Sequence, residues 1–186
     1  VQIFWPSCDS RLFYPMYPDP GLRDELGIDE SEIVLTYNGN VHQANRAEVR
    51  SLYLSVLFLN RMGHPARLIR LGSVIDCMDG ARDIVPPHVI ELGTRANRQI
   101  PAFLALATVL VQPGSPGSFN DYRFPSKIPE FLAMGKPVVL PRSNIGQQLV
   151  HGENCLLLEA GHAGEIVDRV LALKNDGALA KHIAVR

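Results

Sequence analysis

Paired cysteines, basic clusters and long apolar runs are all missing from this 186-residue sequence. No apolar stretch approaches the length of a membrane span, so no transmembrane segment is predicted. The formal net charge is −1 and Lys and Arg form no block, which argues against a nucleic-acid surface or an anionic-membrane patch. Cys8, Cys77 and Cys155 lie far apart without metal-ligand or redox-motif spacing, so we expect a reduced, cytoplasmic protein.

The composition that is present is ordinary for one soluble globular domain. Apolar residues make up 46% and charged residues 20%, and a chain of this length can bury a sizeable core. The sequence begins Val1-Gln-Ile-Phe-Trp5, inside an apolar, strand-like segment and without Met. We therefore expect the chain to be a piece of a longer protein.

Short apolar runs alternate with helical patterns along the chain. Strands are predicted at 33–37, 66–71, 88–92, 108–112, 137–140 and 155–158. Helices are predicted at 22–26, 44–62, 98–106, 127–134, 144–149, 163–174 and 178–184, while residues 74–83 fit neither pattern. Apolar strands alternating with helices indicate a parallel sheet covered on both faces. The predicted fold class is therefore α/β, a doubly wound Rossmann-like sheet of about six strands.

The first thirty residues differ from this alternation. They are rich in proline and carry aromatic residues that we expect to pin an irregular segment to the core: Trp5, Phe13, Tyr14 and Tyr17. Asp19 as a cap, Pro20 in the first turn and Gly27 at the end predict one short helix.

Four predicted strands end in segments rich in glycine and hydrogen-bonding side chains. These segments are 38–42, 72–73, 93–95 and 113–123. Ligands of parallel sheets bind beyond the carboxyl ends of the strands, so these segments should line a site, and their small polar residues suit a nucleotide. None of them contains a P-loop or the dinucleotide glycine fingerprint.

The segment from Arg123 to Pro141 is the most informative part of the chain. It is predicted to form a loop, a short helix, a glycine stop and a buried strand, with Ser126, Lys127 and Glu130 at the loop-to-helix junction. A helix amino terminus attracts phosphate, and a carboxylate one turn further can accept hydrogen bonds from a ribose. The same residues also have plain structural interpretations, Ser126 as a helix cap and Lys127 with Glu130 as an exposed ion pair.

Other polar residues at the predicted sheet edge are weaker candidates. Asn120, Asp121 and Tyr122 could bind sugar hydroxyls, although Asn-Asp also forms plain turns. Arg46 and Arg95 follow strand ends and are candidate phosphate or base contacts, and Thr94 is a further candidate for nucleotide binding. His42 is the only histidine near the expected site, and none of the six histidines is given a metal role.

The stretch Lys127-Ile-Pro-Glu-Phe-Leu-Ala-Met-Gly-Lys-Pro-Val-Val139 resembles a known motif. It is similar to the Glu-Ala-Met-Ala-x-Gly-x-Pro-Val-Val region of the retaining glycosyltransferases with two Rossmann-like domains, the B-type fold of glycosyl transferases group 1. Residues 33–40, 66–72, 105–113 and 145–158 resemble further motifs of that family in the same order. The likeness covers nearly the whole chain, but only the carboxyl-terminal, donor-binding half of such an enzyme. It implies a lead-in segment at 1–30 after a missing amino-terminal domain, and a nucleotide-sugar-binding domain at 31–186.

The resemblance assigns roles to the acidic residues. Glu130 matches the second glutamate of the family's paired-glutamate motif, which holds the donor ribose. The first glutamate, eight positions earlier, falls on Tyr122. Asp121 next to it is a candidate substitute, so the resemblance implies donor-sugar contacts at Asp121 and Tyr122.

The basic residues depart from the family pattern. The Gly-Arg turn reads Gly39-Asn40, and the phosphate-binding lysine falls near Asn45 with Arg46 adjacent. The leaving diphosphate would then be stabilised by the helix dipole at 126–127 and by basic side chains such as Arg123 and Lys127. The resemblance implies no cofactor and no metal for diphosphate binding, and the chain contains no Asp-x-Asp motif.

The function expected from the resemblance is therefore the donor-binding half of a glycosyltransferase. Its partners would be a nucleotide-diphosphate sugar, an unidentified acceptor and the missing acceptor domain, with no nucleic acid. We expect a cytoplasmic location, with peripheral membrane contact through the missing half left open. Two alternatives stay open: a degenerate, non-catalytic nucleotide-binding or scaffold domain, and half of a sugar-nucleotide epimerase.

Overall fold

The computed structural model describes residues 6–75 and 86–185, so Trp5, Cys77 and most of the ambiguous stretch 74–83 lie outside the described residues. Six strands form one parallel sheet in the order β3-β2-β1-β4-β5-β6. The strands are β1 (Ile33–Asn38), β2 (Ala66–Leu71), β3 (Val89–Gly93), β4 (Val109–Val111), β5 (Val138–Pro141) and β6 (Leu156–Leu158). The prediction of a doubly wound α/β fold with six parallel strands is confirmed.

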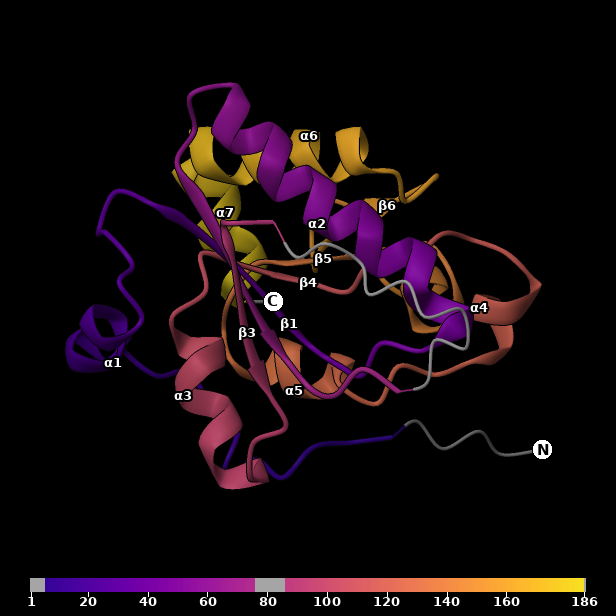
Figure 1. Cartoon of the computed structure of the whole chain (residues 1–186). Helices are drawn as coiled ribbons and strands as arrows, with labels where there is room; N and C mark the ends of the chain where they lie inside the picture. Colours follow the sequence, from indigo (N-terminus) through magenta and orange to yellow (C-terminus); the bar gives the residue numbers. More distant parts are fainter. Residues whose placement is uncertain (1–5, 76–85, 186) are drawn as a thin grey trace.

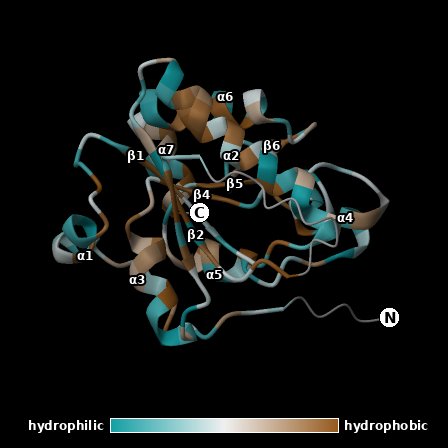
Figure 2. Ribbon diagram, viewed as in Figure 1, coloured by the Kyte–Doolittle hydropathy of each residue, from teal (hydrophilic) through white to brown (hydrophobic). Residues whose placement is uncertain are grey.

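Helices cover both faces of this sheet (Figure 1). On one face α2 (Arg46–Arg61), α6 (Ala163–Asn175) and α7 (Gly177–Val185) enclose a core with the strands. On the other, α3 (Ile100–Ala105) and α5 (Ile128–Ala133) pack under the strands, and α1 (Pro20–Glu25) lies beside α3. Apolar residues are concentrated on the strands and polar ones on the outer helix surfaces, as Figure 2 shows. Among the residues that the structure describes, no helix is both long and apolar enough to cross a bilayer.

Local structure follows the predicted signals in most places. Asp19 caps α1 by accepting hydrogen bonds from the N–H groups of Gly21 and Leu22, as predicted. No helix was predicted in the polar segment 113–123, but this segment contains the short helix α4 (Ser118–Tyr122). The helix predicted at 144–149 is a 3-10 turn, η3 (Asn144–Gln147), and two further 3-10 turns are η1 (Gln43–Asn45) and η2 (Asn97–Gln99).

The lead-in segment is pinned to the core by fewer aromatic residues than expected. Phe13 is buried beside α3 and α5, whereas Tyr14 and Tyr17 are exposed. The expectation of several aromatic anchors was therefore wrong for the two tyrosines.

The strand order indicates where on the sheet a ligand is expected to bind. The chain runs outward from β1 through β2 to β3, and then returns to β4 on the other side of β1. The crossover connections leave β1 and β4 in opposite directions, so a crevice opens between their carboxyl ends, where ligands of such sheets bind. The turn after β1 and the loop after β4 line this crevice.

Candidate functional site

The turn after β1 meets the start of α5 at this edge and brings together Gly39, Lys127 and Glu130. The side-chain amide of Asn38 donates a 3.3 Å hydrogen bond to the Glu130 carboxylate. A methyl group on Gly39 would lie 2.8 Å from the Lys127 Nζ atom and 2.5 Å from the Tyr37 hydroxyl. Only glycine permits this approach, so the turn backbone itself forms one wall of the site.

The packing of α5 explains why Lys127 and Glu130 face the crevice. Ile128, Phe131 and Met134 are fully buried and pack in the core cluster that contains β5. These positions are three residues apart and form one helical stripe, so Lys127 and Glu130 are held on a different face. Lys127 is the N-cap residue of α5, and no side chain caps this helix. The interpretation of Ser126 as the helix cap was therefore wrong.

Burial makes the Lys127 amine unusually acidic. Its pKa is lowered to about 8, first by burial and then by the nearby charge of Arg123, while Glu130 opposes the shift. The Nζ atom also lies 5.1 Å from the centre of the Tyr37 ring, a cation–π contact. Burial likewise raises the pKa of Glu130, which the Asn38 hydrogen bond and Lys127 partly offset. At neutral pH the crevice therefore holds a partly desolvated cation whose charge an anion would stabilise.

Arg123 adds a second cation to the same crevice. Its guanidinium lies 5.0 Å from the centre of the Phe119 ring. Its Nη1 atom is buried and has no hydrogen-bond partner among the described residues. A buried guanidinium donor without a partner is costly, and an anionic ligand bridging Arg123 and Lys127 would remove that cost.

Arg70, which was not predicted as a site residue, stabilises the turn at Gly39 that follows β1. It is 2% exposed, forms an ion pair with Glu91, and donates a 3.2 Å hydrogen bond to the Gly39 carbonyl. Tyr53 also donates its hydroxyl hydrogen to Glu91. The signal for this role was an arginine among the last residues of the predicted strand 66–71, which also carries Arg67 near its start.

The turns after the first three strands stack on one another. The Gly39 N–H donates to the Leu71 carbonyl and the Gly72 N–H donates to the Gly93 carbonyl, both at 2.9 Å. A methyl group on Gly72 would lie 2.6 Å from the Gly39 carbonyl oxygen, and Gly72 has a φ of +110°. The sheet's hydrogen bonding thus continues one residue beyond the strands.

Asn40 and Thr94 lie on these stacked turns. The Asn40 carboxamide accepts the Ser73 N–H at 2.8 Å, and the Ser73 and Thr94 hydroxyls are 2.6 Å apart. Arg95 is exposed and donates to the Thr94 carbonyl. These side chains form the outer rim of the turns, next to the Gly39 wall.

The remaining predicted residues lie further out. Arg46 begins α2 and lines a surface groove with Arg50 and Gln43. Ser126 is exposed. On α4, Tyr122 is 89% exposed, and the Asp121 carboxylate accepts a 3.4 Å hydrogen bond from Gln147. None of these four residues is part of the Gly39–Lys127–Glu130 cluster.

The comparisons with known proteins decide the family. The family model described as Glycosyl transferases group 1 matches residues 32–176, which include β1 to β6 and all of α6. This chain belongs to that family. The group 1 chain is also 25% identical to D-inositol 3-phosphate glycosyltransferase of Pseudarthrobacter chlorophenolicus, over 96% of this chain and 43% of that protein.

Solved structures of glycosyltransferases share the fold. The group 1 chain superposes on Anabaena Alr3699/HepE in complex with UDP and glucose with a TM-score of 0.74 and 20% identity, covering 98% of this chain and 50% of that one. It also superposes on the carboxyl-terminal domain of the group 1 protein LpcC from Francisella tularensis, with a TM-score of 0.69, 16% identity, and coverage of 96% of this chain and 93% of that one. The chain thus spans about half the length of its full-length relatives, and matches a carboxyl-terminal domain almost end to end.

Proposed function

We propose that this chain binds the nucleotide-diphosphate sugar donor of a glycosyltransferase. A second, acceptor-binding half would complete the cleft, and the sugar would pass to the acceptor with retention. The observation that carries the proposal is the close approach of the Lys127 amine to the Gly39 turn. Beside it, the Glu130 carboxylate accepts a hydrogen bond from the Asn38 side chain. One relative of the same fold was solved with UDP and glucose and again with UDP-glucose, which supports a donor of this chemical class.

The donor diphosphate would be held from a different side than the family motif suggests. Asn45, at the position of the motif lysine, is 2% exposed and donates its amide to the Asn40 carbonyl. Asn40 is at the position of the motif arginine, and its side-chain oxygen accepts a hydrogen bond from the Ser73 N–H. In their place, Lys127 and Arg123 supply positive charge from the connection between α4 and α5.

The chemistry follows from this charge. When the bond between the sugar and the diphosphate breaks, the diphosphate leaves with the bonding electrons and its negative charge grows. Two preorganised cations in a partly desolvated crevice stabilise that charge more in the transition state than in the donor. The α5 helix has only six residues, so we assign this role to the side chains rather than to the helix dipole.

The donor sugar would extend toward α4. Asp121 and Tyr122 are the proposed sugar contacts, and Tyr122 is exposed and so accessible to a ligand. The second candidate function is a non-catalytic nucleotide-binding domain. It is favoured by Tyr122 itself, because a phenol at this position cannot replace the charge of the motif glutamate.

Replacing Glu130 with alanine should weaken nucleotide binding by roughly tenfold to a hundredfold, because a carboxylate that accepts ribose hydroxyl hydrogens is lost. Isothermal titration calorimetry with UDP, GDP and ADP and their sugar conjugates would first identify the nucleotide and then measure the change. Glu30→Ala is a matched control, since Glu30 is an exposed carboxylate before the amino end of β1. Equal affinities of wild type and Glu130→Ala would remove Glu130 from the site.

Nucleotide affinity should also fall as the pH rises through about 8. The Lys127 pKa is lowered to about 8, so the amine is charged below that pH and loses its proton above it, while a bound diphosphate favours the charged form. Calorimetry between about pH 7 and about pH 9.5 should show this loss in the wild type, whereas Lys127→Arg should be insensitive because the arginine pKa is above about 12. Identical pH profiles of the two proteins would show that Lys127 does not contact the phosphate.

A further inference from the structure

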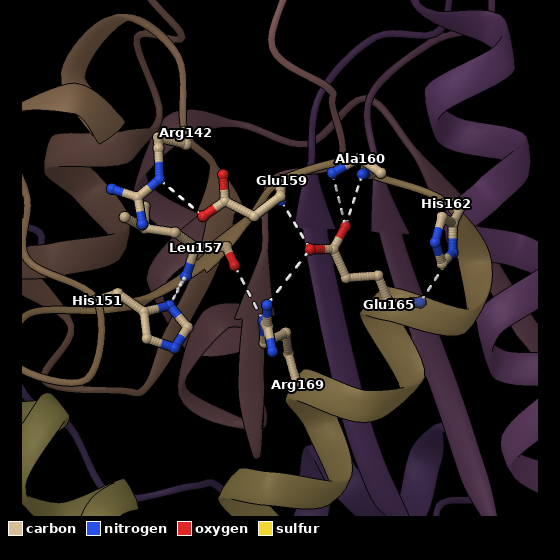
Figure 3. Close-up of polar contacts among 9 residues, drawn as sticks. Arg142, His151, Leu157, Glu159, Ala160, His162, Glu165 and Arg169 are labelled. Atoms are coloured by element: carbon tan, nitrogen blue, oxygen red, sulfur yellow. Dashed lines mark hydrogen bonds and ion pairs between the residues drawn. The ribbon is translucent and has the colours of Figure 1, made fainter.

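One carboxylate holds the turn that follows β6. Glu165 lies in the first turn of α6, and its carboxylate accepts hydrogen bonds from three consecutive backbone N–H groups (Figure 3). The donors are Glu159 at 2.7 Å, Ala160 at 2.9 Å and Gly161 at 2.8 Å. An ordinary helix cap satisfies one or two N–H groups, so this carboxylate fixes the path of the chain before the helix as well.

The surroundings of Glu165 keep it ionised. Burial alone would raise its pKa, but the three N–H donors and Arg169 outweigh burial and lower it. Arg169 lies 3.4 Å from the carboxylate and donates a 3.0 Å hydrogen bond to the Leu157 carbonyl of β6. His162 caps α6 by accepting the Glu165 N–H, as Figure 3 shows. The turn is therefore tied to both β6 and α6 through charged groups.

This turn touches the loop after β4, backbone against backbone. Gly161 has a φ of +70°, and a methyl group on it would lie 2.0 Å from the Gly114 carbonyl oxygen and 3.1 Å from the Ser115 nitrogen. Both the left-handed backbone and the missing side chain are needed here, so any larger residue would push the two segments apart. Gly114 is itself buried, so the contact is closed to solvent.

Hydrogen bonds connect the segment that follows Gly114 to the proposed sugar contacts. The Asn120 amide donates to the Ser115 carbonyl at 2.8 Å and to the Glu48 carboxylate at 2.5 Å. The Asn144 amide donates to the Asp121 carbonyl at 2.9 Å. The segment 114–121, which contains most of α4, is thus held by the 159–161 turn at one end and by η3 at the other.

We propose that Glu165 is a positioning residue for the donor sugar. By fixing the 159–161 turn against Gly114, it sets the position of the segment 114–121, and through it the orientation of the sugar to be transferred. The inference rests on the proposed function. In the proposed function the nucleotide itself binds elsewhere, at Gly39, Lys127 and Glu130. Replacing Glu165 should therefore change the binding of the sugar but not that of the nucleoside diphosphate.

The test compares two affinities in the same protein. Calorimetry with the UDP, GDP and ADP panel gives, for the matching nucleotide, the affinity of the nucleoside diphosphate and of its sugar conjugate. In Glu165→Gln we expect the nucleoside diphosphate affinity to stay within about twofold, while the sugar conjugate weakens by about tenfold relative to it. In the complete protein, turnover should fall by about a hundredfold, because a displaced reacting group costs rate more than binding.

Gly161→Ala is the second variant, because it moves the same contact without removing a charge. Asp168→Asn is the matched control, since Asp168 is an exposed carboxylate one turn further along α6. Thermal unfolding shows which variants are folded, and Gly161→Ala decides the outcome if Glu165→Gln unfolds. Loss of the sugar-specific affinity in folded Glu165→Gln or Gly161→Ala, but not in Asp168→Asn, supports the proposal. Equal losses for nucleotide and conjugate, or none, overturn it, whereas a wild type that binds nothing in the panel overturns the proposed function.

Discussion

Replacing Lys127 with methionine is expected to weaken nucleoside diphosphate binding by about a hundredfold. Methionine keeps the aliphatic stem that packs on Tyr37 but removes the charge. A charge-assisted hydrogen bond to phosphate in a partly desolvated site is worth roughly 1.5–3 kcal/mol, and the Arg123 donor would lose the ligand bridge at the same time. Calorimetry with the nucleotide identified for the wild type measures the change.

Two variants make the Lys127 result specific. Lys181→Met removes an equal charge from the exposed surface of α7 and should leave binding unchanged. Lys127→Arg should keep most of the affinity because it keeps the charge. If Lys127→Met binds as tightly as the wild type, the diphosphate is held by other cations and the arrangement proposed for Lys127 and Arg123 is wrong.

Replacing Arg70 with methionine should lower the free energy of unfolding by about 3 kcal/mol. The change leaves the Glu91 carboxylate without its ion-pair partner and the Gly39 carbonyl without a donor, and breaking a buried ion pair from one side is strongly destabilising. Urea denaturation followed by circular dichroism measures this loss. Nucleotide affinity should fall as well, because the Gly39 turn loses its support.

Arg67→Met provides the comparison on the same strand. Arg67 pairs with Glu32 at 2.9 Å, but its side chain is 29% exposed, so the loss should be no more than about 1 kcal/mol. The double variant Arg70→Met/Glu91→Gln should recover part of the stability, because no buried charge is left unpaired. Equal losses for Arg67→Met and Arg70→Met would show that burial does not set the strength of these pairs.

The sequence predicted the sheet well because its signals are local. Short apolar runs located all six strands to within one residue, and the β–α alternation implied their parallel order. The five-residue helix α4 was missed, and the helix predicted at 144–149 is the 3-10 turn η3. A helix of little more than one turn has no repeat that a sequence pattern can reveal.

The candidate site could be predicted only where its residues lie close together in the sequence. Lys127 and Glu130 lie on one segment, so their shared position could be predicted, and Gly39 follows from a strand-end turn. The Arg70 contact with Gly39 joins residues 31 positions apart, and the contact of Gly161 with Gly114 depends on how two loops meet. Such contacts come from tertiary packing, which residue spacing does not encode.

The stacked turns at Gly39, Gly72 and Gly93 limit how this site can diverge or be redesigned. Because each turn is hydrogen-bonded to the next, an insertion or deletion in one of them would shift the register of its neighbour and of the strand behind it. Length changes are therefore expected to be tolerated poorly at these turns. New donor preferences should arise by exchanging the side chains that project from them, Asn40, Ser73 and Thr94, on a backbone of constant length.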